Sequence, residues 1–353
     1  MTPPLLSKAM KHPPEIIDYL GRIYSEESRT HACRAKNPDS FQSWQSEARP
    51  ALQNLLGLEC IARGAAGHNP SVELDEAEDL GKLTRRQGFI ETEPDVRIHF
   101  WLVQPKGDGP FPLAVAPHGH GENSEYAGIG TERTPREKIE AEDRDVAIQA
   151  AQRGFLAIAP ATRGIAPGGV TDISKRHCGR NCRSHFMHAL LAGRTAMGER
   201  VWDMMRIMDW ASALPEVDAR TTLMLGNSGG GMVTTYTAAC DTRVRIAMPS
   251  CSYNSLVGED GLIHHCDCNG VPGILQFGEF WDIAALIAPR HLITVNGSHD
   301  SLHPTHKVDA AVKRLRDLFA VAGVPERYEH KYGDGGHRFY KTLFWPFVDR
   351  AVT

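Results

Sequence analysis

The sequence lacks the features that mark membrane-spanning, secreted or nucleic-acid-binding proteins. No apolar run approaches the roughly 18 residues that a membrane-spanning helix needs. The first residues do not have the basic-then-apolar layout of a signal peptide. The net charge is only −4, and no basic arm or long run of like charges occurs. We therefore expect a cytoplasmic protein with a small-molecule partner and with neither a nucleic-acid nor a membrane partner.

The composition is that of an ordinary globular enzyme. Of the 353 residues, 41% are apolar and 23% are charged, which allows one large α/β domain with an accessory region. We expect the eight cysteines to be reduced thiols, as in cytoplasmic proteins. The sequence leaves open whether the chain forms a homo-oligomer.

The hydrophobic pattern divides the chain into two parts. Apolar residues recur at helical spacing in 14–24 and in 40–58, which predicts a helical segment over residues 1–80 that packs on the core. From there the period changes to two, and 83–91 and 96–103 are predicted as paired strands. Further predicted buried strands are 113–117, 155–160, 223–225, 244–249, 291–295 and 328–332. Predicted helices between and after them are 140–153, 198–214, 232–239, 308–321 and 339–351. This alternation predicts that 81–353 forms a doubly wound, mostly parallel sheet with helices.

A strand, a tight turn and a helix surround Ser228. The apolar run 223–225 leads into Gly226-Asn-Ser-Gly-Gly230, and a helix is predicted from 232. A serine in a G-x-S-x-G turn between strand and helix is typical of the nucleophile elbow of α/β-hydrolases. The glycines leave room for strand and helix to pass closely while the serine takes a strained conformation. We predict that Ser228 is a catalytic nucleophile.

A serine nucleophile needs a histidine base and an acid that orients it, and both follow later predicted strands. Asp300 comes after the strand 291–295, and His337 comes after the strand 328–332. Their order along the chain, Ser, Asp, His, is that of α/β-hydrolases. Asp334 is nearer to His337 in sequence, but glycines flank it and a turn is expected there. We therefore predict the catalytic triad Ser228, Asp300 and His337.

The strand 113–117 ends in His118-Gly-His-Gly121. In α/β-hydrolases the loop after this strand supplies one backbone N–H to the oxyanion hole, and the residue after the nucleophile supplies the other. The predicted donors are accordingly the backbone N–H groups of His120 and Gly229. The simpler interpretation of the glycines is a turn that ends the strand.

Seven motifs together resemble the acetyl xylan esterase-like branch of the α/β-hydrolases. They are H-G-H-G at 118–121, G-R-T-A-M-G at 193–198, G-N-S-G-G-G at 226–231, H-C-D-C-N-G-V-P-G at 265–273, A-L-I-A-P-R at 285–290, N-G-S-H-D at 296–300 and G-G-H at 335–337. The resemblance implies hydrolysis of esters, typically acetyl groups on carbohydrates. Better-studied members have H-G-Y in the first motif, where this chain has His120. The exchange keeps the backbone N–H but changes the side chain that lines the acyl pocket.

We therefore expect a serine carboxylesterase that removes acetyl or other small acyl groups from a carbohydrate or similar ester, without a cofactor. One alternative is a peptidase or a dienelactone-type hydrolase, although the latter usually has cysteine at the elbow. A second alternative is a ligand-binding protein that has kept the fold. Such proteins usually lose a member of the triad, whereas this chain has all three.

Two segments are rich in metal-ligand residue types. They are His177-Cys178-x3-Cys182-x2-His185-x2-His188 and His264-His265-Cys266-x-Cys268. These spacings are not those of common zinc sites. The preferred interpretation is packing near the cleft mouth with no metal, while a metal site and a disulfide remain alternatives. Segment 251–285 is expected to form a lid-like insertion, in which Phe277, Phe280 and Trp281 could line a pocket or the core.

Overall fold

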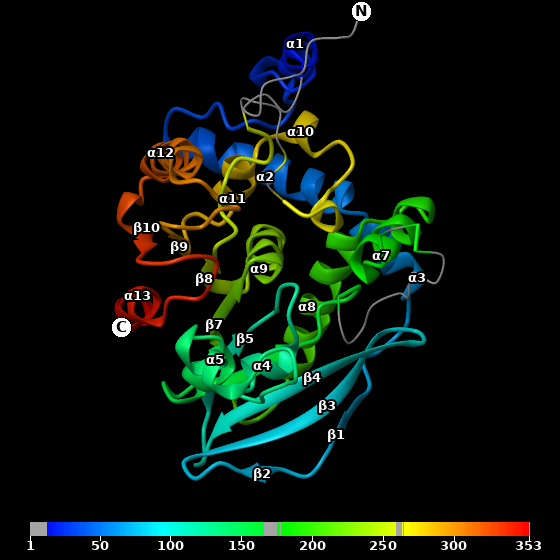
Figure 1. Ribbon diagram of the computed structural model, residues 1–353, viewed down its shortest axis with the longest axis vertical. Coiled ribbons are helices and arrows are strands. Elements are labelled where there is room, and N and C mark those ends of the chain that lie inside the picture. Colours follow the sequence, from blue (N-terminus) through cyan, green and yellow to red (C-terminus); the bar gives the residue numbers. More distant parts are fainter. Residues whose placement is uncertain (1–12, 166–174, 177, 259–262, 264, 353) are drawn as a thin grey trace, which may run out of the picture.

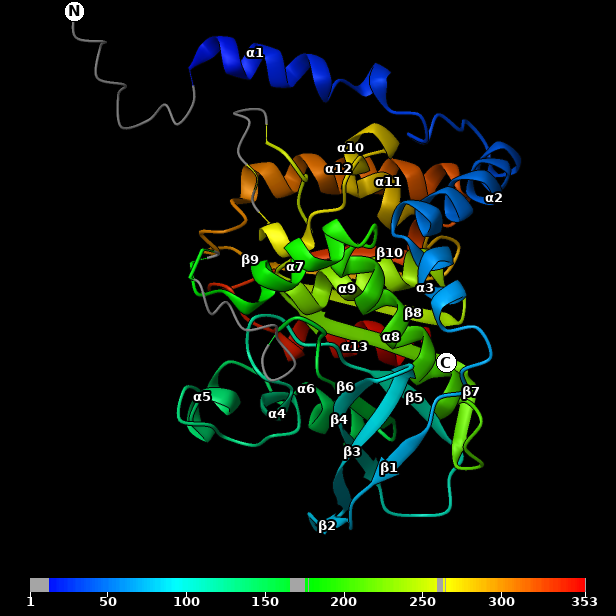
Figure 2. The same ribbon diagram turned by 90° about the vertical axis from the view of Figure 1, so that its right-hand side faces the viewer.

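The computed structural model describes residues 13–165, 175–176, 178–258, 263 and 265–352, and it contains one twisted mixed sheet with helices on both faces (Figures 1 and 2). The strands are β1 (Val72–Leu74), β2 (Glu78–Asp79), β3 (Leu83–Glu93), β4 (Val96–Pro105), β5 (Phe111–Val115), β6 (Leu156–Pro160), β7 (Val217–Asn227), β8 (Val244–Ser250), β9 (His291–Gly297) and β10 (Tyr328–Gly333).

Helices precede the sheet, connect its strands and close the chain. The α-helices are α1 (Pro14–Ile23), α2 (Pro38–Leu55), α3 (Leu58–Gly64), α4 (Asn123–Tyr126), α5 (Arg136–Ala141), α6 (Val146–Ala151), α7 (Asn181–Leu191), α8 (Ala196–Ala211), α9 (Gly229–Cys240), α10 (Ile274–Phe277), α11 (Phe280–Ala285), α12 (Thr305–Val321) and α13 (Lys341–Ala351). The short 3-10 helices are η1 (Glu26–Ser28), η2 (Asp267–Asn269) and η3 (Pro325–Arg327).

The strand order is β1-β3-β4-β6-β5-β7-β8-β9-β10, and β2 pairs with β3. From β6 through β10 every neighbouring pair is parallel. The pairs of β1 and β2 with β3, of β3 with β4 and of β4 with β6 are antiparallel. The sheet is therefore mixed: the strands β5 to β10, which include the elbow strand, form the predicted parallel part. The strands β1 to β4 form an antiparallel half because short turns connect them.

The parallel strands separate two apolar cores. In β5, Leu113 and Val115 pack into the core that contains α8 and α9, while Ala114 packs into the core that contains α6 and α13. In β7, Met224 faces the first core and Leu223 and Leu225 face the second. This alternation is the period-two geometry of a strand that is buried on both faces.

Helix α2 lies beside the C-terminal end of α9, and its polar side chains bond carbonyl groups there. Arg49 donates to the carbonyl of Ala239, and Gln53 Nε2 donates to the carbonyl of Cys240 at 2.9 Å. The last carbonyls of a helix have no partner within the helix, so these contacts cap α9. The apolar face of α2 is buried at the same place, with Leu52 fully enclosed.

The predicted helix 140–153 is wrong as a single element. Helix α5 ends at Ala141, α6 begins at Val146, and Asp143 between them has a positive φ of 56°. A left-handed residue interrupts the helical hydrogen bonds. The carboxylate of Asp143 binds Lys341 Nζ at 2.9 Å and so joins this turn to the start of α13.

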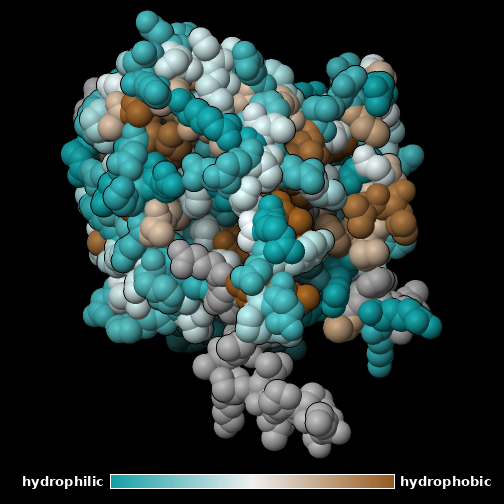
Figure 3. Space-filling view, turned by 90° about the horizontal axis from the view of Figure 1, so that it is seen from above, coloured by the Kyte–Doolittle hydropathy of each residue, from teal (hydrophilic) through white to brown (hydrophobic). Residues whose placement is uncertain are grey.

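Among the described residues, no helix is both long and apolar enough to cross a membrane. The face around α1 and α10 is mostly hydrophilic, and its apolar residues lie in separate groups (Figure 3). Between Cys251 and Ala285 the chain forms a short β-bridge from Val257 to Ile263, η2, α10 and α11.

Candidate active site

Ser228 lies at a sharp turn between β7 and α9. Its backbone has φ 59° and ψ −123°, a conformation that L-residues rarely adopt. The turn is held because Ser228 N donates to Ser250 O on β8 at 2.8 Å. A Cβ on Gly230 would lie 2.0 Å from the carbonyl oxygen of Pro117, and one on Gly226 would lie 2.5 Å from it. Only glycine fits at both positions, so the packing of the loop after β5 against the elbow explains the motif.

Asp300 and His337 meet at the ends of neighbouring parallel strands. Asp300 follows β9, His337 follows β10, and His337 Nδ1 lies 2.7 Å from Asp300 Oδ2. Asp300 Oδ1 accepts a hydrogen bond from the backbone N–H of Leu302 at 2.9 Å, and the side chain is fully buried. Burial acts to raise the pKa of Asp300, but the hydrogen bond and the charge of His337 outweigh it, so the pKa lies below its usual value. The carboxylate is therefore ionised and fixed against the imidazole.

Ser228 and His337 line the same cavity, whose volume is about 680 Å³. His337 Nε2, on the far side of the ring from Asp300, is buried and has no hydrogen-bond partner among the described residues. The structure thus brings the three predicted triad residues to the carboxyl ends of β7, β9 and β10. Asp334 is placed differently: its side chain is fully exposed, and it lies 4.0 Å from His299 Nδ1.

The loop after β5 lies directly against the elbow. A Cβ on Gly119 would be 3.1 Å from Gly229 N and 3.1 Å from Ser228 Cβ, so the two backbones are in contact. Gly229 is the first residue of α9, where a helical N–H has no partner within the helix. His120 follows Gly119 and lines the cavity beside Ser228. Both predicted oxyanion donors therefore belong to backbone next to the serine.

His118 holds the loop after β5 in place through hydrogen bonds. Its Nε2 accepts a hydrogen bond from Thr162 N at 2.9 Å, and Thr162 Oγ1 donates to His118 O at 2.7 Å. With Nε2 as acceptor, Nδ1 carries the proton and donates to Gly119 O at 2.7 Å. Burial lowers the pKa of His118 to about 4, so the ring is neutral at neutral pH. His118 is thus a structural histidine that fixes the loop.

Sequence reasoning missed His303. It is buried, and its ring stacks on that of His337 with centroids 5.8 Å apart and planes 26° apart. The centroid of the His265 ring lies 5.4 Å from that of the His303 ring. The charge of His303 also contributes to lowering the pKa of Asp300. Little in the sequence distinguishes His303, which is one of seventeen histidines and follows Asp300 by three residues.

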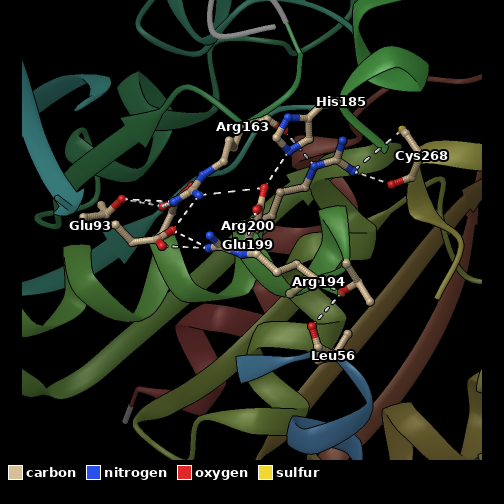
Figure 4. A network of polar contacts seen from close by, with 12 residues as sticks. Leu56, Glu93, Arg163, His185, Arg194, Glu199, Arg200 and Cys268 are labelled. Carbon is tan, nitrogen blue, oxygen red and sulfur yellow. Dashed lines mark hydrogen bonds and ion pairs between the residues drawn. The ribbon is translucent and has the colours of Figure 1, made fainter. Parts of the chain in front are cut away.

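A buried ion-pair network around Arg163 was also not predicted (Figure 4). Arg163 binds Asp203 on α8 and lies 2.6 Å from Glu93 on β3. Arg194 binds Glu93 at 2.7 Å and Glu199 at 2.9 Å, and His185 Nε2 lies 2.7 Å from Glu199. The network joins β3 and α8 to the segment after β6.

We expect Arg163→Met to destabilise the protein by about 3 to 5 kcal/mol, because it leaves the buried carboxylate of Asp203 without its counter-charge. Urea unfolding followed by circular dichroism would measure this. Arg220→Met is the matched control, since Arg220 pairs with Asp218 but has a side chain that is 88% exposed. Its unfolding midpoint should barely change. A loss in Arg163→Met as small as that expected for Arg220→Met would show that the buried network is not stabilising.

Three cysteines and one histidine converge at the wall of the cavity. They are Cys182 on α7, Cys266 before η2, Cys268 in η2, and His120, and their ligand atoms all lie within 4.8 Å of one another. Hydrogen bonds from Cys182 and Cys266, together with the Arg200 guanidinium, lower the pKa of Cys268. Of the other residues of the two motifs, His185 joins Glu199, His265 lines the cavity, Cys178 is exposed, and His177 and His264 lie outside the described residues.

Comparisons with known proteins agree with this architecture. No family model matches the chain. YtaP of Bacillus subtilis (strain 168), provisionally named a hydrolase, is 28% identical over 155 residues. That match takes in 43% of this chain and about half, 52%, of the relative's length.

Solved structures cover nearly the whole chain. A provisionally named acetyl xylan esterase from Bacteroides fragilis NCTC 9343 superposes with a TM-score of 0.74 at 15% identity, over 94% of each chain. A glucuronoyl esterase from Solibacter usitatus superposes with a TM-score of 0.62 at 16% identity, over 92% of this chain and 96% of that one. The protein therefore has the α/β-hydrolase type of fold that these esterases share, as its motifs predicted.

Proposed function

We propose that the protein is a serine-dependent carboxylic ester hydrolase. The observation that carries the proposal is the hydrogen bond between His337 and the buried carboxylate of Asp300, at a cavity that His337 and Ser228 both line. A buried carboxylate on Nδ1 holds the imidazole in the tautomer that leaves Nε2 free to accept a proton. A serine hydrolase needs this arrangement to activate its nucleophile.

In the proposed mechanism, Ser228 Oγ attacks the carbonyl carbon of the ester while its proton passes to His337 Nε2. The alcohol then leaves with that proton, and an acyl-serine remains. A water molecule gives a proton to His337 and attacks the acyl carbon. The acid departs as Ser228 regains its proton, so each cycle consumes one ester and one water.

The negative charge on the tetrahedral oxygen needs donors that are already in place. We assign this role to the backbone N–H groups of Gly229 and His120. The support is their location: Gly229 begins α9, and the loop that carries His120 is fixed by His118 and Thr162. Because these donors are backbone groups, they are present in this chain even though it has His120 where related esterases have tyrosine.

For the substrate, we propose a small acyl ester of a carbohydrate, with acetyl as the acyl group. The cavity, at about 680 Å³, has room for a sugar residue beside the nucleophile. Segment 251–285 contributes His265, Cys266 and Asn269 to its wall, as a lid-like insertion would. The acetyl xylan esterase of similar fold is consistent with this choice.

One observation favours a second candidate, an ester of a sugar acid. Arg133 and Arg180 line the cavity, and none of its described lining residues is Asp or Glu. Guanidinium groups bind carboxylates strongly, so an oligosaccharide that carries further uronate groups would fit such a wall. The glucuronoyl esterase of similar fold supports this class of substrate.

Two measurements test the proposal. A fluorophosphonate probe should label the protein, and mass spectrometry should place the label on Ser228. Initial rates should then be compared on acetylated xylo-oligosaccharides and on methyl esters of oligouronates. Faster turnover of the first supports deacetylation, and faster turnover of the second supports the sugar-acid ester. Failure of the probe to label Ser228 would contradict the serine mechanism.

A further inference from the structure

We propose that Cys182, Cys266, Cys268 and His120 bind one metal ion, with Zn²⁺ as the best fit, in a closed tetrahedral site. This site is separate from the catalytic triad, and it does not depend on the function proposed above. It also differs from the sequence-based expectation that these cysteines only pack.

The geometry of the four ligand atoms fits zinc. Cys268 Sγ lies 3.5 Å from His120 Nε2, and all four atoms lie within 4.8 Å of one another. Ligands at a Zn–S distance of about 2.3 Å and a Zn–N distance of about 2.0 Å lie about 3.5 Å apart at a tetrahedral angle, and two sulfurs lie about 3.8 Å apart. Small movements of the side chains would therefore complete the site.

The set of ligands identifies the kind of metal and its role. Three thiolates and one imidazole form a soft donor set that selects Zn²⁺ over Mg²⁺ or Ca²⁺. Four protein ligands fill the tetrahedron and leave no position for water or substrate, which is typical of a structural site. Packing alone does not explain why three thiols from two distant segments of the chain and one histidine gather at a single point.

A disulfide accounts for the cluster less well. Any one disulfide would use two of the three sulfurs and leave the third thiol and His120 unexplained. All three cysteines are free thiols in the structure.

A buried cation beside the cluster gives independent support. Arg200 is fully buried, and its Nη1 lies 3.1 Å from Cys268 O and 3.7 Å from Cys268 Sγ (Figure 4). Within the part of the chain that the structure describes, no carboxylate lies within ion-pair distance of Arg200. A buried charge needs compensation. Zn²⁺ with three thiolates carries one net negative charge, which would balance this guanidinium.

The metal would join three segments around the cavity. His120 comes from the loop after β5, Cys182 from the first turn of α7, and Cys266 and Cys268 from the segment after β8. The first turn of α7 and the segment after β8 are not joined to each other by the β-sheet. We therefore assign the ion a positioning role, in which it fixes the wall of the cavity and the loop that bears the His120 N–H.

The test is the metal content of the full-length protein, measured by inductively coupled plasma mass spectrometry after purification with zinc and extensive dialysis. We expect about one Zn²⁺ per chain in the wild type. Cys268→Ser and Cys266→Ser should each lower the zinc content at least tenfold. Cys178→Ser is the matched control, since Cys178 is an exposed thiol near Cys182 but outside the cluster. Its zinc content should equal that of the wild type.

A second measurement does not rely on the variants folding. Metal-free, reduced wild-type protein is titrated with Co²⁺, which should produce the intense thiolate-to-metal charge-transfer absorption of a tetrahedral site. Zn²⁺ should then abolish that absorption. Absence of both bound zinc and this absorption in folded wild type overturns the proposal, as does a disulfide among the three cysteines in freshly prepared protein. Zinc retained in both cluster variants would overturn it as well.

Discussion

Ser228→Ala should lower kcat on p-nitrophenyl acetate by a factor on the order of 10⁴ to 10⁶, while the protein stays folded. The substitution removes only the hydroxyl oxygen from a half-buried residue, and the backbone contact from Ser228 N to Ser250 O remains. Without Oγ no acyl-enzyme can form, although binding and the oxyanion donors persist. Circular dichroism and the unfolding midpoint should match those of the wild type.

Ser252→Ala provides the control for the serine variant. Ser252 lines the same cavity but does not lie at the elbow. Its loss should change kcat by less than about tenfold, which is far below the loss expected for a covalent nucleophile. An unchanged rate in Ser228→Ala would end the serine-hydrolase proposal, and equal losses in both variants would show that the cavity rather than the nucleophile is responsible.

Asp300→Asn should lower kcat by roughly 10²- to 10⁴-fold. An amide can donate a hydrogen bond to His337 Nδ1, which would stabilise the tautomer that has its proton on Nε2. That nitrogen could then no longer accept the proton of Ser228. The amide also removes the negative charge that stabilises the imidazolium. Because Asp300 also accepts a bond from Leu302 N, folding must be checked for this variant.

Asp334→Asn is the matched comparison, since Asp334 is closer to His337 in sequence. Its side chain is fully exposed, and the base it approaches is His299, at 4.0 Å, rather than His337. We expect a change of less than about threefold, because an exposed charge at that distance interacts weakly. Both variants should be assayed on the same activated ester. If Asp334→Asn were inactive and Asp300→Asn active, the catalytic acid would be Asp334 and the assignment of Asp300 would be wrong.

The elbow and the acid–base pair could be predicted because each depends on a short stretch of sequence. A buried parallel strand is an uninterrupted apolar run, and the residues that follow it lie at the carboxyl edge of the sheet. The positions of Ser228, Asp300 and His337 follow from this rule, and the structure brings all three to that edge. Their catalytic roles stay predictions until the variants are assayed.

Features that depend on distant contacts could not be predicted in this way. Helix 140–153 has the right composition, but a contact between Asp143 and Lys341, nearly 200 residues apart, accompanies its interruption. The Arg163 network likewise joins residues from β3, the segment after β6, and α8. The cysteine cluster does not have a standard zinc spacing because its ligands come from three separate segments, and only the fold shows that they meet.

The capping of α9 by α2 has a consequence for attempts to shorten this chain. Helix α9 starts at the nucleophile elbow, and its far end is bonded by Arg49 and Gln53. A version that begins at the first strand would expose the carbonyls of Ala239 and Cys240 and the apolar surface that Leu52 covers. Helix α2 is thus part of the structural support of the elbow. Fusion partners and affinity tags belong before α1 or after α13, and circular permutants should keep α2 in contact with α9.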